Sequence, residues 1–255
     1  MQVSGRRTFE SDLFDIDLRG GHIISVESRP NELVFPSDFL SDREETRIRF
    51  ILVDWLIEIT ALWKLRPNTV HLMIQLVDRY YLMHQKVPKD IAQKVGCVCL
   101  WIAAKFHEVY KIPLAEDICY VSDDLITSRE LITMEMQMLI DLEFNLWYPT
   151  LYDVWTENWD HKVEPFSEER IYVMNFLLEV IAFFPENQRR DKRELVQGAI
   201  MLSLLLTLGE KRIENPLCLF LFQQVKRIIH SCNLTGIQKK YSKIVDYVKN
   251  NKWSI

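Results

Sequence analysis

The chain has 255 residues, of which 48% are hydrophobic and 26% are charged, a balance typical of a globular protein with one large core or two smaller ones. Its 7 glycines and 9 prolines supply too few turns for a β-sandwich or a barrel, so the composition favours helices. A formal net charge of −5, with lysines and arginines spread along the chain, argues against nucleic acid as a partner.

The first half of the chain predicts five helices, because its apolar residues recur at spacings of three and four. The predicted ranges are 41–65, 69–83, 88–107, 114–121 and 127–141. Ser41 with Glu44, and Thr127 with Glu130, have the spacing of capping boxes at two of the helix starts. The segment 88–107 is apolar nearly all round, so we expect it in the middle of a bundle.

The helical pattern breaks near 147–150, and a second series of five helices is predicted after it. The predicted ranges are 151–160, 167–184, 191–208, 216–231 and 235–249. The segment 191–208 is again apolar on most sides, and Gly209 is a typical residue to end it. The sequence therefore predicts an all-α protein with an N-terminal arm over 1–40, a first bundle over 41–149 and a second bundle over 150–255.

Four motifs occur in order between residues 40 and 150. Residues 48–58 read IRFILVDWLIE and residues 77–79 read VDR, which are similar to the signature of the first helix of the cyclin box and to the D-R pair of its second helix. Residues 103–108 read AAKFHE, where the family has A-[AS]-K-F-E-E, and Met134-Glu135 follows at the family's spacing. The resemblance implies two tandem five-helix cyclin folds. It also implies a regulatory subunit, not an enzyme, that binds and allosterically activates a cyclin-dependent kinase in the cell cycle.

The resemblance assigns six residues to the surface that binds the kinase. Lys105 and Glu135 stand where cyclins place a lysine and a glutamate that hydrogen-bond backbone groups around the kinase's mobile regulatory helix. Without the resemblance, a lysine at the end of a helix is interpreted as a solvated residue. The apolar residues assigned to the same surface, for which a place in the core is the alternative, are Phe106, Leu139, Phe144 and Leu146.

An apolar stripe on the first predicted helix has two possible roles. Its members, spaced as i, i+3, i+4 and i+7, are Ile48, Ile51, Leu52 and Trp55. In an anonymous helix this pattern indicates core. In cyclins the equivalent stripe is an exposed groove that binds the R-x-L segment of substrates and inhibitors. Gln93 matches the polar member of that groove, and Glu58 is a candidate partner for the arginine of the segment.

Three further positions receive roles from the same resemblance. Arg49 and Asp78 are expected to form a buried ion pair between the first two helices, because an unpaired buried charge would be costly. That role is structural. His107 stands where cyclins usually have glutamate, and we expect it to be exposed and solvated.

Two other classes of function fit the sequence less well. A cyclin fold that binds DNA or a basal transcription factor is disfavoured by the acidic charge. An all-α enzyme is disfavoured because the sequence has no phosphate-binding loop, no nucleophile motif and no histidine cluster, and its five cysteines lack C-x-x-C spacing. We therefore expect no catalytic residue, no metal, no cofactor, no membrane span and no signal peptide.

The expected partners are a cyclin-dependent kinase of the G1/S class, in a heterodimer, and R-x-L-containing substrates or inhibitors. We expect the protein in the nucleus and the cytoplasm. The short N-terminal arm, and R-x-x-L matches that fall only inside predicted helices at 49–52 and 79–82, resemble the cyclins encoded by gammaherpesviruses, which act in a host cell. A truncated cellular cyclin is the alternative.

Overall fold

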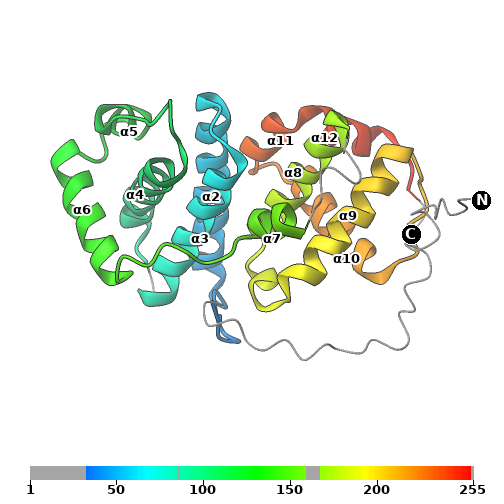
Figure 1. Cartoon of the computed structure of the whole chain (residues 1–255), viewed down its shortest axis with the longest axis horizontal. Helices are drawn as coiled ribbons and strands as arrows, with labels where there is room; N and C mark the ends of the chain where they lie inside the picture. Colours follow the sequence, from blue (N-terminus) through cyan, green and yellow to red (C-terminus); the bar gives the residue numbers. More distant parts are fainter. Residues whose placement is uncertain (1–32, 85–86, 159–166, 254–255) are drawn as a thin grey trace, which may run out of the picture. The chain divides into compact units, whose positions relative to one another are not determined.

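The computed structural model describes residues 33–84, 87–158 and 167–253. This part of the chain contains eleven α-helices and one 3-10 helix and no β-strand (Figure 1). The all-α class predicted from composition and periodicity is confirmed. Of the predicted N-terminal arm, only residues 33–40 lie within the described part of the chain, so its extent stays a prediction.

Five helices form a first group, and each follows a predicted range closely. They are α2 (Arg43–Trp63), α3 (Pro67–Met83), α4 (Lys89–His107), α5 (Ala115–Val121) and α6 (Ser128–Asp141). The central position predicted for 88–107 is confirmed, because α4 packs against the other four helices of the group. Gly96 permits this packing, since a Cβ atom there would lie only 2.6 Å from Leu52 Cδ1 on α2.

The N-caps of α2 and α6 can be compared with the two predicted capping boxes. Thr127 and Glu130 form the predicted capping box: the amide of Glu130 donates to Thr127 Oγ1 at 3.2 Å, and the amide of Thr127 donates to Glu130 Oε2 at 2.9 Å. The box predicted at Ser41 is wrong. Asp42 caps α2 instead, because its carboxylate accepts from the amides of the next two glutamates at 2.8 and 2.9 Å.

The remaining helices form a second group, in which one predicted helix is divided and one short element was not predicted. They are α7 (Leu151–Asn158), α8 (Glu168–Phe183), the 3-10 helix η1 (Pro185–Arg189), α9 (Lys192–Leu208), α10 (Pro216–Ile229), α11 (Gly236–Lys240) and α12 (Ser242–Asn250). The helix predicted over 235–249 is interrupted at Tyr241, whose buried hydroxyl donates to Glu179 Oε1 at 2.7 Å. Gly209 ends α9 in the left-handed conformation, with φ 74°, as expected of a glycine there.

The two groups are in contact along α2 and α3. Helix α3 packs against α7 and α8, and α2 packs against α11. Asp54 on α2 accepts hydrogen bonds from the amides of Gly236 and Ile237, at 2.8 and 3.0 Å, and so caps α11. The buried apolar residues of both groups form one continuous cluster, so the division predicted between residues 149 and 150 stays a prediction.

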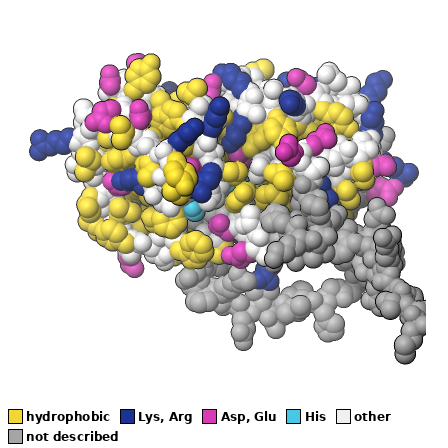
Figure 2. Space-filling view, turned by 45° about the horizontal axis from the view of Figure 1, so that its top comes forward, with side chains coloured by type: hydrophobic (Ala, Val, Ile, Leu, Met, Phe, Trp, Pro, Cys, Tyr) yellow, Lys and Arg dark blue, Asp and Glu magenta, His cyan; other side chains and the backbone are white. Residues whose placement is uncertain are grey.

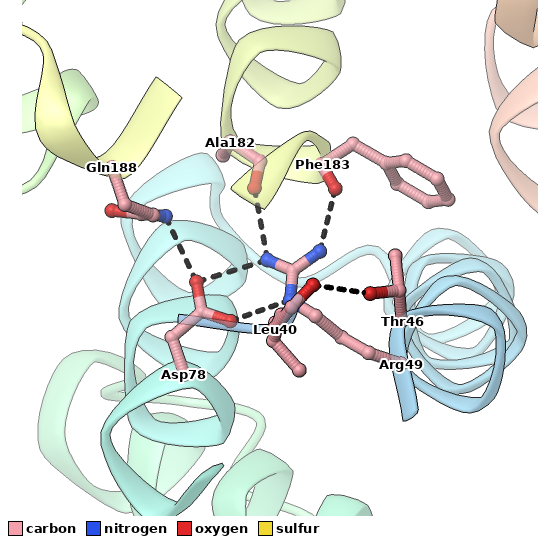
Figure 3. Close-up of polar contacts among 7 residues, drawn as sticks. All are labelled: Leu40, Thr46, Arg49, Asp78, Ala182, Phe183 and Gln188. Atoms are coloured by element: carbon pink, nitrogen blue, oxygen red, sulfur yellow. Dashed lines mark hydrogen bonds and ion pairs between the residues drawn. The ribbon is translucent and has the colours of Figure 1, made fainter. Parts of the chain in front are cut away.

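A buried arginine lies at the centre of this contact (Figure 3). The ion pair expected between Arg49 and Asp78 is present, with Arg49 Nε 2.5 Å from Asp78 Oδ1 and both side chains fully buried. The guanidinium also donates to the carbonyls of Phe183 and Ala182, at 2.5 and 3.1 Å, and Gln188 donates to Asp78 Oδ2 at 2.8 Å. Arg49 therefore satisfies the last carbonyls of α8 as well as its partner on α3, which the sequence did not indicate.

Candidate partner-binding surface

The structure brings Lys105 and Glu135 together although they are 30 positions apart in the sequence. Lys105 lies in the last turn of α4, Glu135 lies on α6, and the two side chains form an ion pair. The ammonium group of Lys105 also lies 3.7 Å from the centre of the Trp101 ring. About a third of the Lys105 side chain is exposed, so the pair remains accessible to a partner.

Of the four apolar residues assigned to the same surface, two are exposed and two are shared with the core. Phe106 and Phe144 are 45% and 61% exposed. Leu139 and Leu146 are half-buried and pack against the core. The two interpretations of these residues, binding surface and core, therefore apply to different members of the set.

Including these two phenylalanines, twelve large hydrophobic residues between positions 106 and 147 are exposed. This set, called the apolar face below, comprises Phe106, Val109, Tyr110, Ile112, Leu114, Tyr120, Leu125, Ile132, Met136, Ile140, Phe144 and Trp147. Hydrophobic side chains are visible at the surface of the left part of Figure 2, where Figure 1 places α4, α5 and α6. Exposed hydrophobic residues in this number are more than the scattered single ones of an ordinary surface, so this part of the chain is the candidate binding surface.

Most of the apolar face was not predicted from the sequence. One signal was available on α6, where Ile132, Met136 and Ile140 recur at a spacing of four, on a face that differs from that of the buried Leu131 and Met138. A helix with two apolar faces has more apolar surface than one core can cover. The loop residues of the apolar face have no such periodic signal.

The loop between α4 and α5 is held in place at both ends. Glu108, just after α4, accepts from the backbone amide of Arg66 at 2.8 Å and from Thr69 Oγ1 at 2.6 Å. Near the other end of the loop, Trp101 Nε1 donates to the carbonyl oxygen of Pro113 at 3.0 Å. The apolar side chains of this loop are therefore carried on an ordered backbone.

The turn after α6 is strained and holds Phe144 outward. Glu143 and Phe144 have φ values of 53° and 54°, in the left-handed region that non-glycine residues rarely adopt. Arg79, the arginine of the D-R motif, donates to the carbonyl of Asn145 at 2.7 Å and stacks 4.6 Å from the ring of Tyr148. These contacts stabilise the turn that exposes Phe144.

His107 does not have the environment expected of it. It is half-buried, and its Nδ1 lies 3.0 Å from the side-chain nitrogen Nδ2 of Asn68, which donates a hydrogen bond to it. Burial, helped by the nearby positive charge of Arg66, lowers the pKa of His107 below its ordinary value. The prediction of an exposed, solvated histidine is wrong, because Asn68 on α3 covers one side of the ring.

The apolar stripe on α2 has a mixed environment. Leu52 is buried and contacts the position of Gly96, as a core residue does, whereas Ile51 is 46% exposed. The half-buried members are Ile48, Trp55 and, on α4, Gln93. The groove as predicted therefore has one member that belongs to the core, and its remaining members keep accessible surface. Whether they bind R-x-L segments stays a prediction.

The acidic neighbour proposed for this groove already has a partner. Glu58 Oε1 lies 2.6 Å from the ammonium group of Lys239 on α11, so α11 neutralises the carboxylate. The sequence did not indicate this pairing, because it does not show which lysine the fold brings to Glu58. Whether Glu58 also binds the arginine of an R-x-L segment stays a prediction.

Within the described part of the chain, no three metal-binding side chains lie together, and no helix has both the length and the apolarity to cross a membrane. The candidate site is instead an apolar face around a charged pair on an ordered helical scaffold. Such a surface is typical of a protein that acts by binding another protein.

Comparison with known proteins finds similarity to cyclins. Residues 23–147 match the family described as "Cyclin, N-terminal domain". The chain is 40% identical to the G2/mitotic-specific cyclin-A of Hydra viridissima over 106 residues, which are 42% of this chain and 25% of that protein. It is 31% identical to the G2/mitotic-specific cyclin-B of Arbacia punctulata over 179 residues, which are 69% of this chain and 42% of that protein. The matches thus span less than half of either relative.

A solved structure shows the same fold. The crystal structure of a viral cyclin from herpesvirus saimiri matches with a TM-score of 0.56 and 19% sequence identity, over 80% of this chain and 85% of that one. The chain therefore contains a cyclin N-terminal domain.

Proposed function

We propose that this chain binds a cyclin-dependent kinase and activates it allosterically. The observation that carries the proposal is the Lys105–Glu135 pair within the apolar face, because these are the residues that the cyclin resemblance assigns to the kinase's regulatory helix. Charged groups at a largely apolar interface fix the orientation of the partner, and the apolar residues contribute the affinity.

Activation would follow from a shift between two states of the kinase. An inactive kinase holds its regulatory helix away from the site, so the lysine and glutamate that position the ATP phosphates cannot pair. A rigid helical surface that binds only the inward position stabilises the active state. A shift from about 1:99 to 99:1 requires roughly 5.5 kcal/mol of differential affinity. The kinase supplies the catalytic residues.

Three finer assignments belong to the same proposal. The preferred kinase is of the G1/S class, and the accessible members of the α2 stripe, with Gln93, recruit R-x-L-containing substrates or inhibitors. The complex acts in the nucleus and the cytoplasm, in a host cell if the chain is viral. These assignments rest on the box residues between 48 and 146 and on the exposure of Ile51.

A kinase assay tests the proposal. The purified chain, mixed with candidate cyclin-dependent kinases, is expected to raise histone phosphorylation, and Lys105→Ala with Glu135→Ala is expected to abolish that activation without unfolding the protein. The pair is partly exposed, so its contribution to the free energy of unfolding should be about 1 kcal/mol or less. Failure of the unaltered chain to bind any such kinase at micromolar concentration would refute the proposal.

A matched control is available in the second helix group. Arg212 and Glu214 form an exposed ion pair at 2.9 Å, and no member of the apolar face lies near them in the sequence. Their double alanine variant removes two charges of the same kinds and should activate the kinase normally. Equal loss of activation in both double variants would contradict the assigned site.

A further inference from the structure

Trp101 contacts two separate parts of the candidate surface. It lies one turn before Lys105 on α4, and only 9% of it is exposed. The face of its ring lies beneath the Lys105 ammonium group at 3.7 Å, and its Nε1–H donates to the Pro113 carbonyl at 3.0 Å. One nearly buried side chain is therefore joined to both the charged pair and the loop that carries part of the apolar face.

The first contact restricts a flexible side chain. A lysine has four rotatable bonds, and ordering it on binding costs conformational entropy. In this structure the ammonium group of Lys105 is attracted by the face of Trp101 and by the carboxylate of Glu135. Its position is therefore largely set before any partner arrives.

The second contact restricts the loop. Residues Val109, Tyr110, Ile112 and Leu114 are 65%, 96%, 43% and 65% exposed, so their own side chains contribute little packing that would hold the loop. The bond from the indole to the Pro113 carbonyl lies on the buried side of the same loop. A loop of this kind, without its buried hydrogen bond, would sample more conformations.

We propose that Trp101 is a positioning residue of the partner-binding surface. It holds Lys105 and the 109–114 loop in the conformation that binds the partner. The proposal rests on the proposed function, because the partner is the kinase. Trp101 itself does not reach the partner, since it is nearly buried. It acts through Lys105 and through the backbone of the loop.

Two substitutions separate the two contacts. Trp101→Phe keeps an aromatic ring beneath Lys105 but loses the Nε1–H donor, and Trp101→Leu loses both. We expect kinase affinity to fall about threefold in the first variant and about tenfold in the second, mostly through faster dissociation. Thermal unfolding of each variant shows whether the protein is still folded, and Trp101→Phe provides the test if Trp101→Leu is not.

The contact with Lys105 is tested in a second background. In Lys105→Met protein no ammonium group remains above the ring, so the affinities of Trp101→Phe and Trp101→Leu should become equal. A merely structural role of the ring would leave the difference between Phe and Leu unchanged. Persistence of the difference in the Lys105→Met background would overturn this half of the proposal.

The contact with the loop is tested without the kinase. Hydrogen exchange of the backbone amides of residues 109–112 and 114 should be faster in Trp101→Phe than in the unaltered protein. Trp253→Phe is the matched control, because Trp253 is half-buried in the second helix group and its Nε1 donates to the carbonyl of Val248 at 3.1 Å. That variant loses an equivalent hydrogen bond and should leave both loop exchange and kinase affinity unchanged.

The possible results are distinguishable. If the unaltered chain binds no cyclin-dependent kinase, the proposed function fails, and with it the claim that Trp101 serves a kinase. A second result is that the unaltered chain binds the kinase, both Trp101 variants bind it equally well, and hydrogen exchange in the loop of Trp101→Phe is unchanged. The positioning role of Trp101 is then overturned, and the proposed function stands. Faster exchange together with weaker binding, absent in Trp253→Phe, supports the proposal.

Discussion

The first helix group, α2 to α6, and the second, α7 to α12, are each built around a helix that is apolar on most of its sides, α4 and α9. They differ in the surface that they leave uncovered. Among the described residues, twelve of the eighteen large hydrophobic side chains that are exposed lie between 106 and 147, whereas only Ile171 and Leu208 lie in the second group. Similar internal packing thus accompanies different surfaces, and the uncovered apolar residues indicate which group binds a partner.

The largest expected effect concerns the residue that joins the two groups. Arg49→Met should reduce the free energy of unfolding by about 3 to 5 kcal/mol, because Asp78 remains buried without its partner. Chemical denaturation measures the loss. The double variant Arg49→Met with Asp78→Leu should be less destabilised than the single one, since it buries no unpaired charge. An equal loss in both would contradict the role given to the ion pair.

The loss of stability in Arg49→Met should depend on pH. Burial raises the pKa of Asp78 despite the opposing effect of Arg49, and removal of Arg49 raises it further. A carboxyl group whose pKa is higher in the folded state contributes most stability below its unfolded pKa, near 3.8, and loses that contribution as the pH rises through its folded pKa. The deficit of Arg49→Met relative to the unaltered protein should therefore shrink as the pH falls from 7 toward 4.

A smaller effect is expected for the α2 stripe, where core and groove roles meet. Leu52→Ala should cost about 2 to 5 kcal/mol because Leu52 is buried, whereas Trp55→Ala should cost about 1 to 2 kcal/mol because Trp55 is half-buried. Trp55→Ala should also weaken binding of R-x-L peptides and spare activation of the kinase on short substrates without the motif. A folded Trp55→Ala protein with unchanged peptide affinity would rule out the groove.

The cap of α6 should contribute still less. Thr127→Ala should reduce the free energy of unfolding by about 1 kcal/mol, the usual cost of a lost N-cap. Hydrogen bonds from the Thr127 amide and hydroxyl, and then from Lys94, lower the pKa of Glu130 to about 2. A carboxylate whose pKa is lowered in the folded state stabilises the fold at pH values above its ordinary pKa of 4.5. That contribution is lost as the pH falls toward 2. Thermal unfolding of Glu130→Gln should therefore approach that of the unaltered protein in acid.

The smallest change in stability is expected for two exposed residues, one from each helix group. Phe106→Ser and Leu208→Ser should each change the free energy of unfolding by about 1 kcal/mol or less, since the two side chains are 45% and 68% exposed. Titration with the kinase should show weaker binding only for Phe106→Ser. Weaker binding by Leu208→Ser would extend the partner surface to the second group and remove the contrast between the two.

Local features of the chain were predictable because their causes lie within a few residues. The ranges of α4 and α9 follow from apolar periodicity, and the cap of α6 needs only Thr127 and Glu130, three positions apart. The pairing of Arg49 with Asp78 was also expected, although the two are 29 positions apart, because the cyclin motifs contain both and buried charges need partners.

What the tertiary structure alone decided depends on residues that are distant in the sequence. Tyr241, which separates α11 from α12, is bonded to Glu179 over 62 positions, and Asp54 caps the start of α11 over more than 180 positions. Two further contacts join residues distant in the sequence: the hydrogen bond of Asn68 to His107 and the ion pair of Lys239 with Glu58. Periodicity identifies the apolar faces of a helix such as α6 but cannot show which face a neighbour covers, because covering depends on how the helices pack. For that reason the sequence alone determined most of the helices and the family resemblance, and only the packed structure decided where apolar surface remains for a partner.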